Sequence, residues 1–161
     1  YDNVPAQEVR TLTAKDYRPC CMTPLYDAIG TTITRVHNAK SKNDDVSLAL
    51  VTIITDGYEN ASCEYSLTAI TSLIESYKDE GWQFTYIGAD HDVEKVAYSL
   101  HIEHSLKFEK TPQATAAMFA KERKARHKWT DKLACLMQED DLDEDDRMER
   151  IKNANKDKYF D

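Results

Sequence analysis

The sequence lacks the features that define several large classes of protein. No apolar run approaches the roughly 20 residues that span a bilayer, so no membrane partner is expected. The cysteines include no CxxC pair, which excludes the usual zinc-binding spacing. We interpret all of them as free thiols in a reducing compartment, which predicts a cytoplasmic location. They are Cys20, Cys21, Cys63 and Cys135.

Positive charge is also scarce. The 161 residues hold 21 Lys and Arg against 29 Asp and Glu, which gives a formal net charge of −8. Because nucleic-acid binding depends on clustered cations, no nucleic acid is expected as a partner, whereas a bound cation is compatible with this charge. The chain contains no GxSxG, P-loop, GxGxxG or HExxH motif, and these motifs mark common catalytic and nucleotide sites. The absences favour a noncatalytic protein over an enzyme.

One apolar stretch organises the rest of the chain. Residues 46–54 are apolar or small without the alternation of a half-exposed strand, which predicts a central parallel strand covered on both faces. Thr55, Asp56 and Gly57 follow it directly. In an open α/β sheet, ligands bind at the carboxyl ends of the strands. Asp56 is therefore a candidate site residue.

Helical and strand patterns alternate along the chain. Helices are expected from Thr23-Pro24, over 67–77 with Gly81 just beyond the end, over 93–100 and from Thr111 to about Gln138; strands are expected over 82–88 and 105–108. This order predicts an α/β fold with a doubly wound, mostly parallel sheet. The charged residues 139–161 are expected to form a tail outside the core, with 139–146 disordered.

Two segments resemble a known family. CMTPLYDAIG, which holds Thr23, and VTIITDGYENAS, which holds Asp56, are similar to loops of the von Willebrand factor type A (vWA) domain, specifically its compact bacterial intracellular versions. WQFTYIGAD is similar to the family's next strand. The resemblance covers residues 1–108 and implies a Rossmann-like fold. It also implies a metal-ion-dependent adhesion site (MIDAS) for Mg²⁺, or for Mn²⁺ or Ca²⁺, with Thr23 and Asp56 as ligands.

One element of the family pattern is missing. The family's site also takes a DxSxS loop, and no DxSxS occurs in this sequence, so metal binding is expected to be weak or absent without that segment. The chain opens at Tyr1 without an initiator Met, and we expect a fragment that lacks the family's first strand. The expected organisation is a partial vWA domain over 1–110, a helix over 111–138 that packs on or extends from it, and the tail over 139–161. One edge of the central strand would then stay unpaired, which favours association through that edge.

The resemblance implies a noncatalytic protein-binding module, in which the cation held by Thr23 and Asp56 engages an acidic side chain of a partner protein. Glu59 and Asn60, beside Asp56, are candidates for contact with that partner. Two alternatives stay open. One is a Mg²⁺-dependent hydrolase or phosphotransfer enzyme that uses Asp56, with Asp27 or Asp90 as the second carboxylate. The other is a metal-free structural or assembly domain.

The candidate residues also have structural interpretations. Thr before Pro is typical of a helix N-cap, and Asp-Gly is a common turn pair, so Thr23 and Asp56 indicate a metal site only together. Asp90 is interpreted as the cap of the following helix. His101 and His104 lie three residues apart without a third ligand nearby, and we interpret them as a solvated pair.

Overall fold

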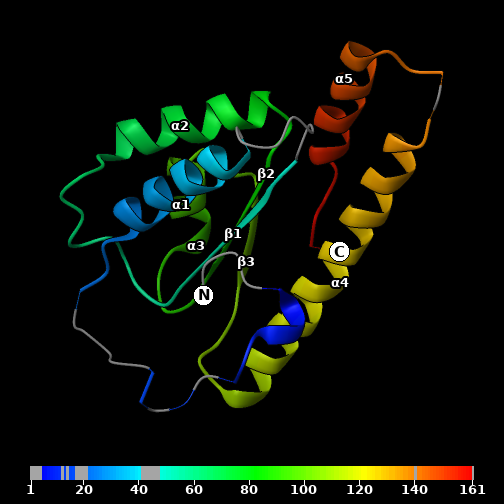
Figure 1. Cartoon of the computed structure of the whole chain (residues 1–161). Coiled ribbons are helices and arrows are strands. Elements are labelled where there is room, and N and C mark those ends of the chain that lie inside the picture. The colour runs from blue at the N-terminus through cyan, green and yellow to red at the C-terminus, as the bar shows by residue number, and fades with distance from the viewer. Residues whose placement is uncertain are drawn as a thin grey trace.

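The computed structural model describes residues 5–11, 13, 15–16, 22–40, 48–139 and 141–160. Helices and strands alternate through most of this part of the chain (Figure 1). In chain order the elements are the 3₁₀ helix η1 (Ala6–Glu8), α1 (Leu25–Lys40), β1 (Leu50–Thr55), α2 (Leu67–Asp79), β2 (Gln83–Gly88), α3 (Val93–Ser99), β3 (His104–Lys107), α4 (Pro112–Met137) and α5 (Glu144–Asn155). Residues 46 and 47, where the central strand was expected to begin, lie outside the described residues.

The three strands form one parallel sheet in the order β1-β2-β3. The register pairs Leu50 with Gln83 and Thr55 with Gly88, and β3 continues it by pairing Lys107 with Gly88. The predicted α/β fold with a parallel sheet is confirmed, and it is compatible with a Rossmann-like fold. Among the described residues β1 pairs with β2 alone, which agrees with the expected open edge.

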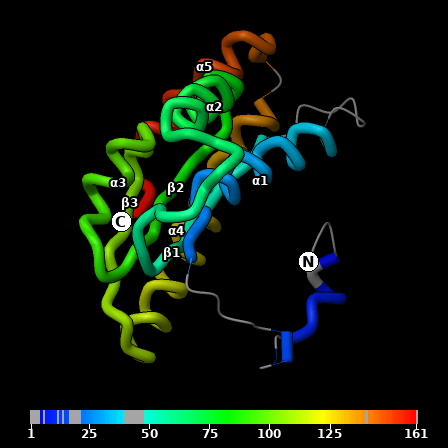
Figure 2. Tube along the Cα trace, turned by 90° about the vertical axis from the view of Figure 1, so that its left-hand side faces the viewer, coloured from blue at the N-terminus to red at the C-terminus, as the bar shows by residue number. Residues whose placement is uncertain are grey.

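Helices α1, α2 and α3 cover one face of the sheet. The apolar stripe of α1 recurs at helical spacing, and its Leu25, Ile29 and Ile33 are all buried. They join a hydrophobic core with Val51 and Ile53, which point to this face because successive strand residues alternate between the two faces. Helices α1 and α2 run side by side in both views (Figures 1 and 2). The expected helical stripe is therefore confirmed as the contact between helix and sheet.

Helix α4 lies over the opposite face. Thr111 is its N-cap and accepts a hydrogen bond from the Ala114 N–H at 3.1 Å, as the Thr-Pro pair predicts. A groove on this side is lined by Leu50 and Ile54 of β1 and by Trp129 of α4. Helices therefore lie on both faces of the sheet. The prediction that residues 46–54 form a central strand covered on both faces is wrong for the described part of this stretch: β2 is the middle strand and is buried along its length, whereas β1 lies at an edge and its Ile54 is 47% exposed.

The C-terminal segment is part of the packed structure, so the prediction of a tail outside the core is wrong. Asp143 caps α5 by accepting the Asp146 N–H at 2.8 Å, and the acidic first turn of α5 suits the positive end of the helix dipole. Ile151 is only 1% exposed. The Asn155 side chain donates to the Gly81 carbonyl at 3.0 Å. The few apolar residues of α5 stand among many charges, and for this reason its apolar pattern is weak.

Candidate functional site

Three loops meet at the carboxyl edge of the sheet, because the parallel strands end in register. Asp56 directly follows β1, Asp90 is the second residue after β2, and Lys110 lies between β3 and α4. Lys110 Nζ is 3.3 Å from Asp56 Oδ2 and 2.9 Å from Asp90 Oδ2. Each strand end thus contributes one charged side chain to a common point. We refer to Asp56, Asp90 and Lys110 as the edge triad.

The edge triad is open to solvent. The side chains of Asp56, Asp90 and Lys110 are 74%, 60% and 43% exposed. The hydrogen bond to Asp90 and the contacts with Asp56 raise the pKa of Lys110, against a smaller opposing effect of burial. The ammonium therefore keeps its charge at neutral pH. It balances only one of the two carboxylates, so the edge attracts further positive charge.

The turn that carries Asp90 is held by buried neighbours. Asp90 has φ +57°, a left-handed conformation that Asp tolerates better than most residues. The next residue, His91, is buried, with Nδ1 2.5 Å from the Ala89 carbonyl and Nε2 3.0 Å from the Tyr86 hydroxyl. Because a carbonyl only accepts, Nδ1 carries a proton, and in the neutral ring Nε2 accepts from Tyr86. A β-carbon on Gly88 would lie 2.6 Å from His91 Cε1, so the ring requires glycine there.

Asp90 is not the cap of the following helix. Asp92 fills that position, and its side chain accepts the Lys95 N–H at 3.2 Å. The expectation placed the cap two residues too early, because the turn of Ala89–Asp90 was not visible in the sequence. Asp90 is instead free to face Lys110.

Thr23 lies beside the loop that follows β1. Its Oγ1 is 3.9 Å from the point that a β-carbon on Gly57 would occupy. Within the described residues, no hydrogen bond of the Thr23 hydroxyl to a helix amide occurs, so the N-cap interpretation is wrong. The Thr23 backbone is held by Asn60, whose Oδ1 accepts the Thr23 N–H at 2.7 Å and whose N–H donates to the Thr23 carbonyl at 3.2 Å. The structure thus places Thr23 beside the loop that carries Asp56, and their role as metal ligands stays a prediction.

A second polar cluster closes the N-terminus of α1. We refer to it as the α1 latch, and it consists of Asp27, Glu59, Asn60 and Ser62. Glu59 accepts four hydrogen bonds: from the N–H groups of Tyr26 at 3.0 Å, Ala61 at 2.8 Å and Ser62 at 2.7 Å, and from Ser62 Oγ at 2.7 Å. Burial alone would raise the pKa of Glu59, but these hydrogen bonds outweigh it and lower the pKa to about 2.

Asp27 completes the α1 latch from the helix side. Its carboxylate accepts three backbone N–H groups, from Cys63 at 2.8 Å, Glu64 at 2.9 Å and Tyr65 at 2.8 Å. The bond from Cys63 is the largest of several causes that lower the pKa of Asp27. Asp27 therefore ties the loop to the helix and is a poor candidate for a general base.

The two predicted partner contacts, Glu59 and Asn60, both hold the loop against α1. Contact with a partner stays a prediction for them. The sequence offered one signal for this role, since polar residues that follow a strand and precede a helix often bond to free helix amides.

The donors at the sheet edge are oxygen atoms, which suit a hard cation such as Mg²⁺. Thr23 offers a hydroxyl, and Asp56 and Asp90 offer carboxylates that already converge on one ammonium. Within the described residues, no group of three or more His, Cys, Asp or Glu side chains is placed to hold a metal ion. A cation at this edge would therefore take most of its ligands from water.

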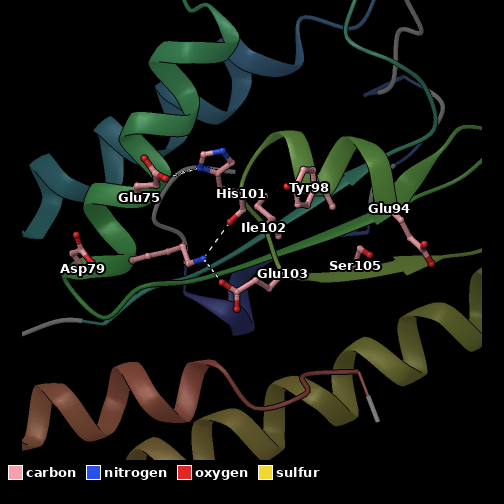
Figure 3. A pocket seen from close by; sticks show the side chains of 10 residues that line it. Glu75, Asp79, Glu94, Tyr98, His101, Ile102, Glu103 and Ser105 are labelled. Carbon is pink, nitrogen blue, oxygen red and sulfur yellow. Dashed lines mark hydrogen bonds and ion pairs between the residues drawn. The ribbon is translucent and has the colours of Figure 1, made fainter.

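A hollow of about 880 Å³ lies between α2, α3 and the start of β3, lined by none of the edge triad (Figure 3). Four of its charged side chains form two pairs across the hollow. His101 Nδ1 is 2.6 Å from Glu75 Oε1, and Lys78 Nζ donates to Glu103 Oε1 at 2.8 Å and to the His101 carbonyl at 3.2 Å. These two pairs account for four of the charges of the hollow without a ligand, and Asp79 and Glu94 line it outside these pairs.

The two histidines near this hollow do not act as a pair. His101 binds Glu75, whereas half-buried His104 donates from Nε2 to the Asn155 carbonyl at 2.7 Å. The interpretation as a solvated pair is therefore wrong for His104, because α5 covers it. The cysteines that the structure describes, Cys63 and Cys135, are free and exposed; Cys20 and Cys21 lie outside the described residues.

The helices in the described ranges are all too short or too polar to cross a membrane. Comparisons with protein-family models, curated proteins and solved structures gave no match. The resemblance to the vWA family therefore stays a prediction. The geometry of the edge triad is the basis for the function proposed below. Lys110 was missed from the sequence, where its only signal is its place in the loop after the third parallel strand.

Proposed function

We propose that the chain is a noncatalytic binding module of the vWA type. A divalent cation at the carboxyl edge of the sheet, held by Thr23 and Asp56, would engage a carboxylate of a partner protein. The observation that carries the proposal is the convergence of Asp56 and Asp90 on one positive charge, 3.3 and 2.9 Å from Lys110 Nζ. Asp90 is accordingly proposed as a further ligand.

The exposure of this edge supports binding to a macromolecule. Mg²⁺ prefers octahedral oxygen coordination and keeps several waters when few protein ligands are present. Such a cation would hold exchangeable positions toward solvent, where an acidic side chain of a partner can replace water. The predicted partner contacts Glu59 and Asn60 follow Asp56 in the same loop, and Asn60 is exposed.

A metal-free assembly domain is the second candidate. Lys110 already bridges the two carboxylates, so the sheet edge can be stable without a metal. Among the described residues, β1 also leaves one edge unpaired, which suits assembly by strand addition. For the hydrolase alternative, Asp27 is a poor second carboxylate because three backbone amides engage it. Asp90, which meets Asp56 at Lys110, is the second carboxylate that this alternative would use, and the alternative stays a prediction.

Calorimetric titration of the chain with Mn²⁺ and Mg²⁺ tests the proposal. We expect weak binding, with a dissociation constant on the order of 1 mM, as for exposed sites with few charged ligands. Asp56→Ala should abolish it. Asp131→Asn is the matched control, because Asp131 is an exposed residue of α4 and the substitution removes one negative charge. If the unaltered chain binds neither ion, or if Asp131→Asn weakens binding as much as Asp56→Ala, the metal-dependent function is wrong and the assembly domain replaces it.

A further inference from the structure

We infer that Lys110 is a built-in competitor of the metal ion, so that its ammonium must leave the sheet edge before a divalent cation binds. This inference rests on the proposed function. The inference adds a regulatory contact to the proposed metal site, because the metal affinity would then depend on the position of the Lys110 side chain.

The geometry makes the two cations mutually exclusive. Lys110 Nζ lies 2.9 Å from Asp90 Oδ2 and 3.3 Å from Asp56 Oδ2, and so it uses the carboxylate oxygens that face the common point. A Mg²⁺ ion on the same oxygens would lie about 2.1 Å from each. Ammonium and metal would then be in contact, and like charges at that distance repel strongly. One of them has to leave.

The side chain of Lys110 can leave without disturbing the fold. Its backbone is fixed on both sides: the Phe108 N–H donates to the Gly88 carbonyl at 3.1 Å, and Thr111 caps α4. The side chain itself is 43% exposed and consists of a flexible four-carbon stem. Release of the ammonium is therefore a rotation into solvent, and α4 can stay in place.

The bridge lowers the apparent metal affinity, which equals the intrinsic affinity multiplied by the fraction of molecules in which Lys110 is released. Two exposed ion pairs are individually weak. The bridge therefore lowers the metal affinity but does not prevent metal binding. We expect Lys110→Gln to bind Mn²⁺ about fivefold more tightly than the unaltered chain, because the oxygens are then free and no positive charge remains beside them.

The experiment compares Mn²⁺ binding by four proteins, with calorimetry and the electron paramagnetic resonance signal of free Mn²⁺ as independent readouts. They are the unaltered chain, Lys110→Gln, Lys110→Arg and Lys107→Gln. Lys110→Arg keeps a cation in reach of both carboxylates and should bind as the unaltered chain does. Lys107→Gln is the matched control, because it removes one exposed positive charge at the end of β3 and leaves the bridge intact.

Binding by the unaltered chain that becomes tighter in Lys110→Gln alone, and that is lost when Asp56→Ala is added, supports the inference. Equal affinity of Lys110→Gln and the unaltered chain overturns the inference while the metal site itself stands. An equal gain in Lys107→Gln also overturns it, since net charge would then be the cause. If none of the four proteins binds Mn²⁺, the proposed function and this inference both fail.

Discussion

The α1 latch and the edge triad lie within one loop of each other, yet their carboxylates are used in opposite ways. Glu59 accepts four hydrogen bonds from protein groups, three of them backbone amides. Asp56, three residues earlier, is 74% exposed and contacts the ammonium of Lys110. A carboxylate that satisfies backbone amides is part of the fold, because buried amides must be bonded. A carboxylate that faces water beside a movable lysine is available to a ligand.

The hydrogen-bond partners show which carboxylate of this loop supports the fold and which is available for binding, whereas their positions in the sequence do not. Asp56 and Glu59 are both acidic residues in the loop that follows β1. Residue type alone therefore makes them equally good candidates for a binding site. Their hydrogen-bond partners distinguish them. The comparison predicts that substitutions in the α1 latch reduce stability, whereas substitutions in the edge triad mainly change binding.

The largest expected effect is the loss of Glu59. Glu59→Ala leaves the amides of Tyr26, Ala61 and Ser62 without their acceptor, and we expect the free energy of unfolding to fall by about 2 to 3 kcal/mol. Asp56→Ala removes an equal charge from the same loop and should cost about 0.5 kcal/mol or less. Urea unfolding followed by circular dichroism measures both. Equal losses in the two variants would mean that the edge is as structural as the latch.

The second prediction concerns pH. The fold lowers the pKa of Glu59 from 4.5 to about 2, so the folded state favours the ionised form. The resulting stabilisation is complete above pH 4.5 and is lost as the pH falls toward 2. We expect the unaltered chain to be more stable than Glu59→Gln at pH 7, by about 2 kcal/mol, and this difference to shrink below pH 4.5.

Unfolding measured between pH 7 and 2 for both proteins gives the difference directly. Asp27, whose pKa is also lowered, destabilises both proteins as the pH falls; its contribution cancels only in part, because the charge of Glu59 raises the pKa of Asp27 and is absent from Glu59→Gln. A difference between the two proteins that stays constant over this range would exclude the ionised carboxylate as the cause.

Most elements of the fold could be predicted because they have a local signal. The apolar run of β1, the Thr-Pro start of α4 and Gly81 beyond the end of α2 all lie where the sequence indicates them; Gly81 has φ +86°, which its lack of a side chain permits. Helix α5 was not predicted as part of the core, because Ile151 stands in a segment of charged residues and its burial depends on α4 and Gly81.

The candidate site could be predicted only in part. Thr23 and Asp56 were found from a resemblance, and the structure places Thr23 beside the loop that carries Asp56. Lys110 was missed, because it meets Asp56 only through the pairing of three strands that are far apart in the sequence. The α1 latch was missed for the same reason, since its hydrogen bonds span more than 30 residues. Contacts across the sheet edge have no local pattern that a sequence could show.

The smallest expected effect on stability is at Asp90, where two substitutions distinguish the contribution of its charge from that of its backbone conformation. Its φ of +57° costs more for Ala than for Asp, Asn or Gly, so Asp90→Ala should lower the free energy of unfolding by about 1 kcal/mol. Asp90→Asn removes the same charge but keeps a residue that tolerates this conformation, and it should cost less than about 0.5 kcal/mol. Thermal unfolding of the two variants measures the contrast. If Asp90→Asn is as unstable as Asp90→Ala, the ion pair with Lys110 holds the turn, and the edge triad is then a structural cluster like the α1 latch.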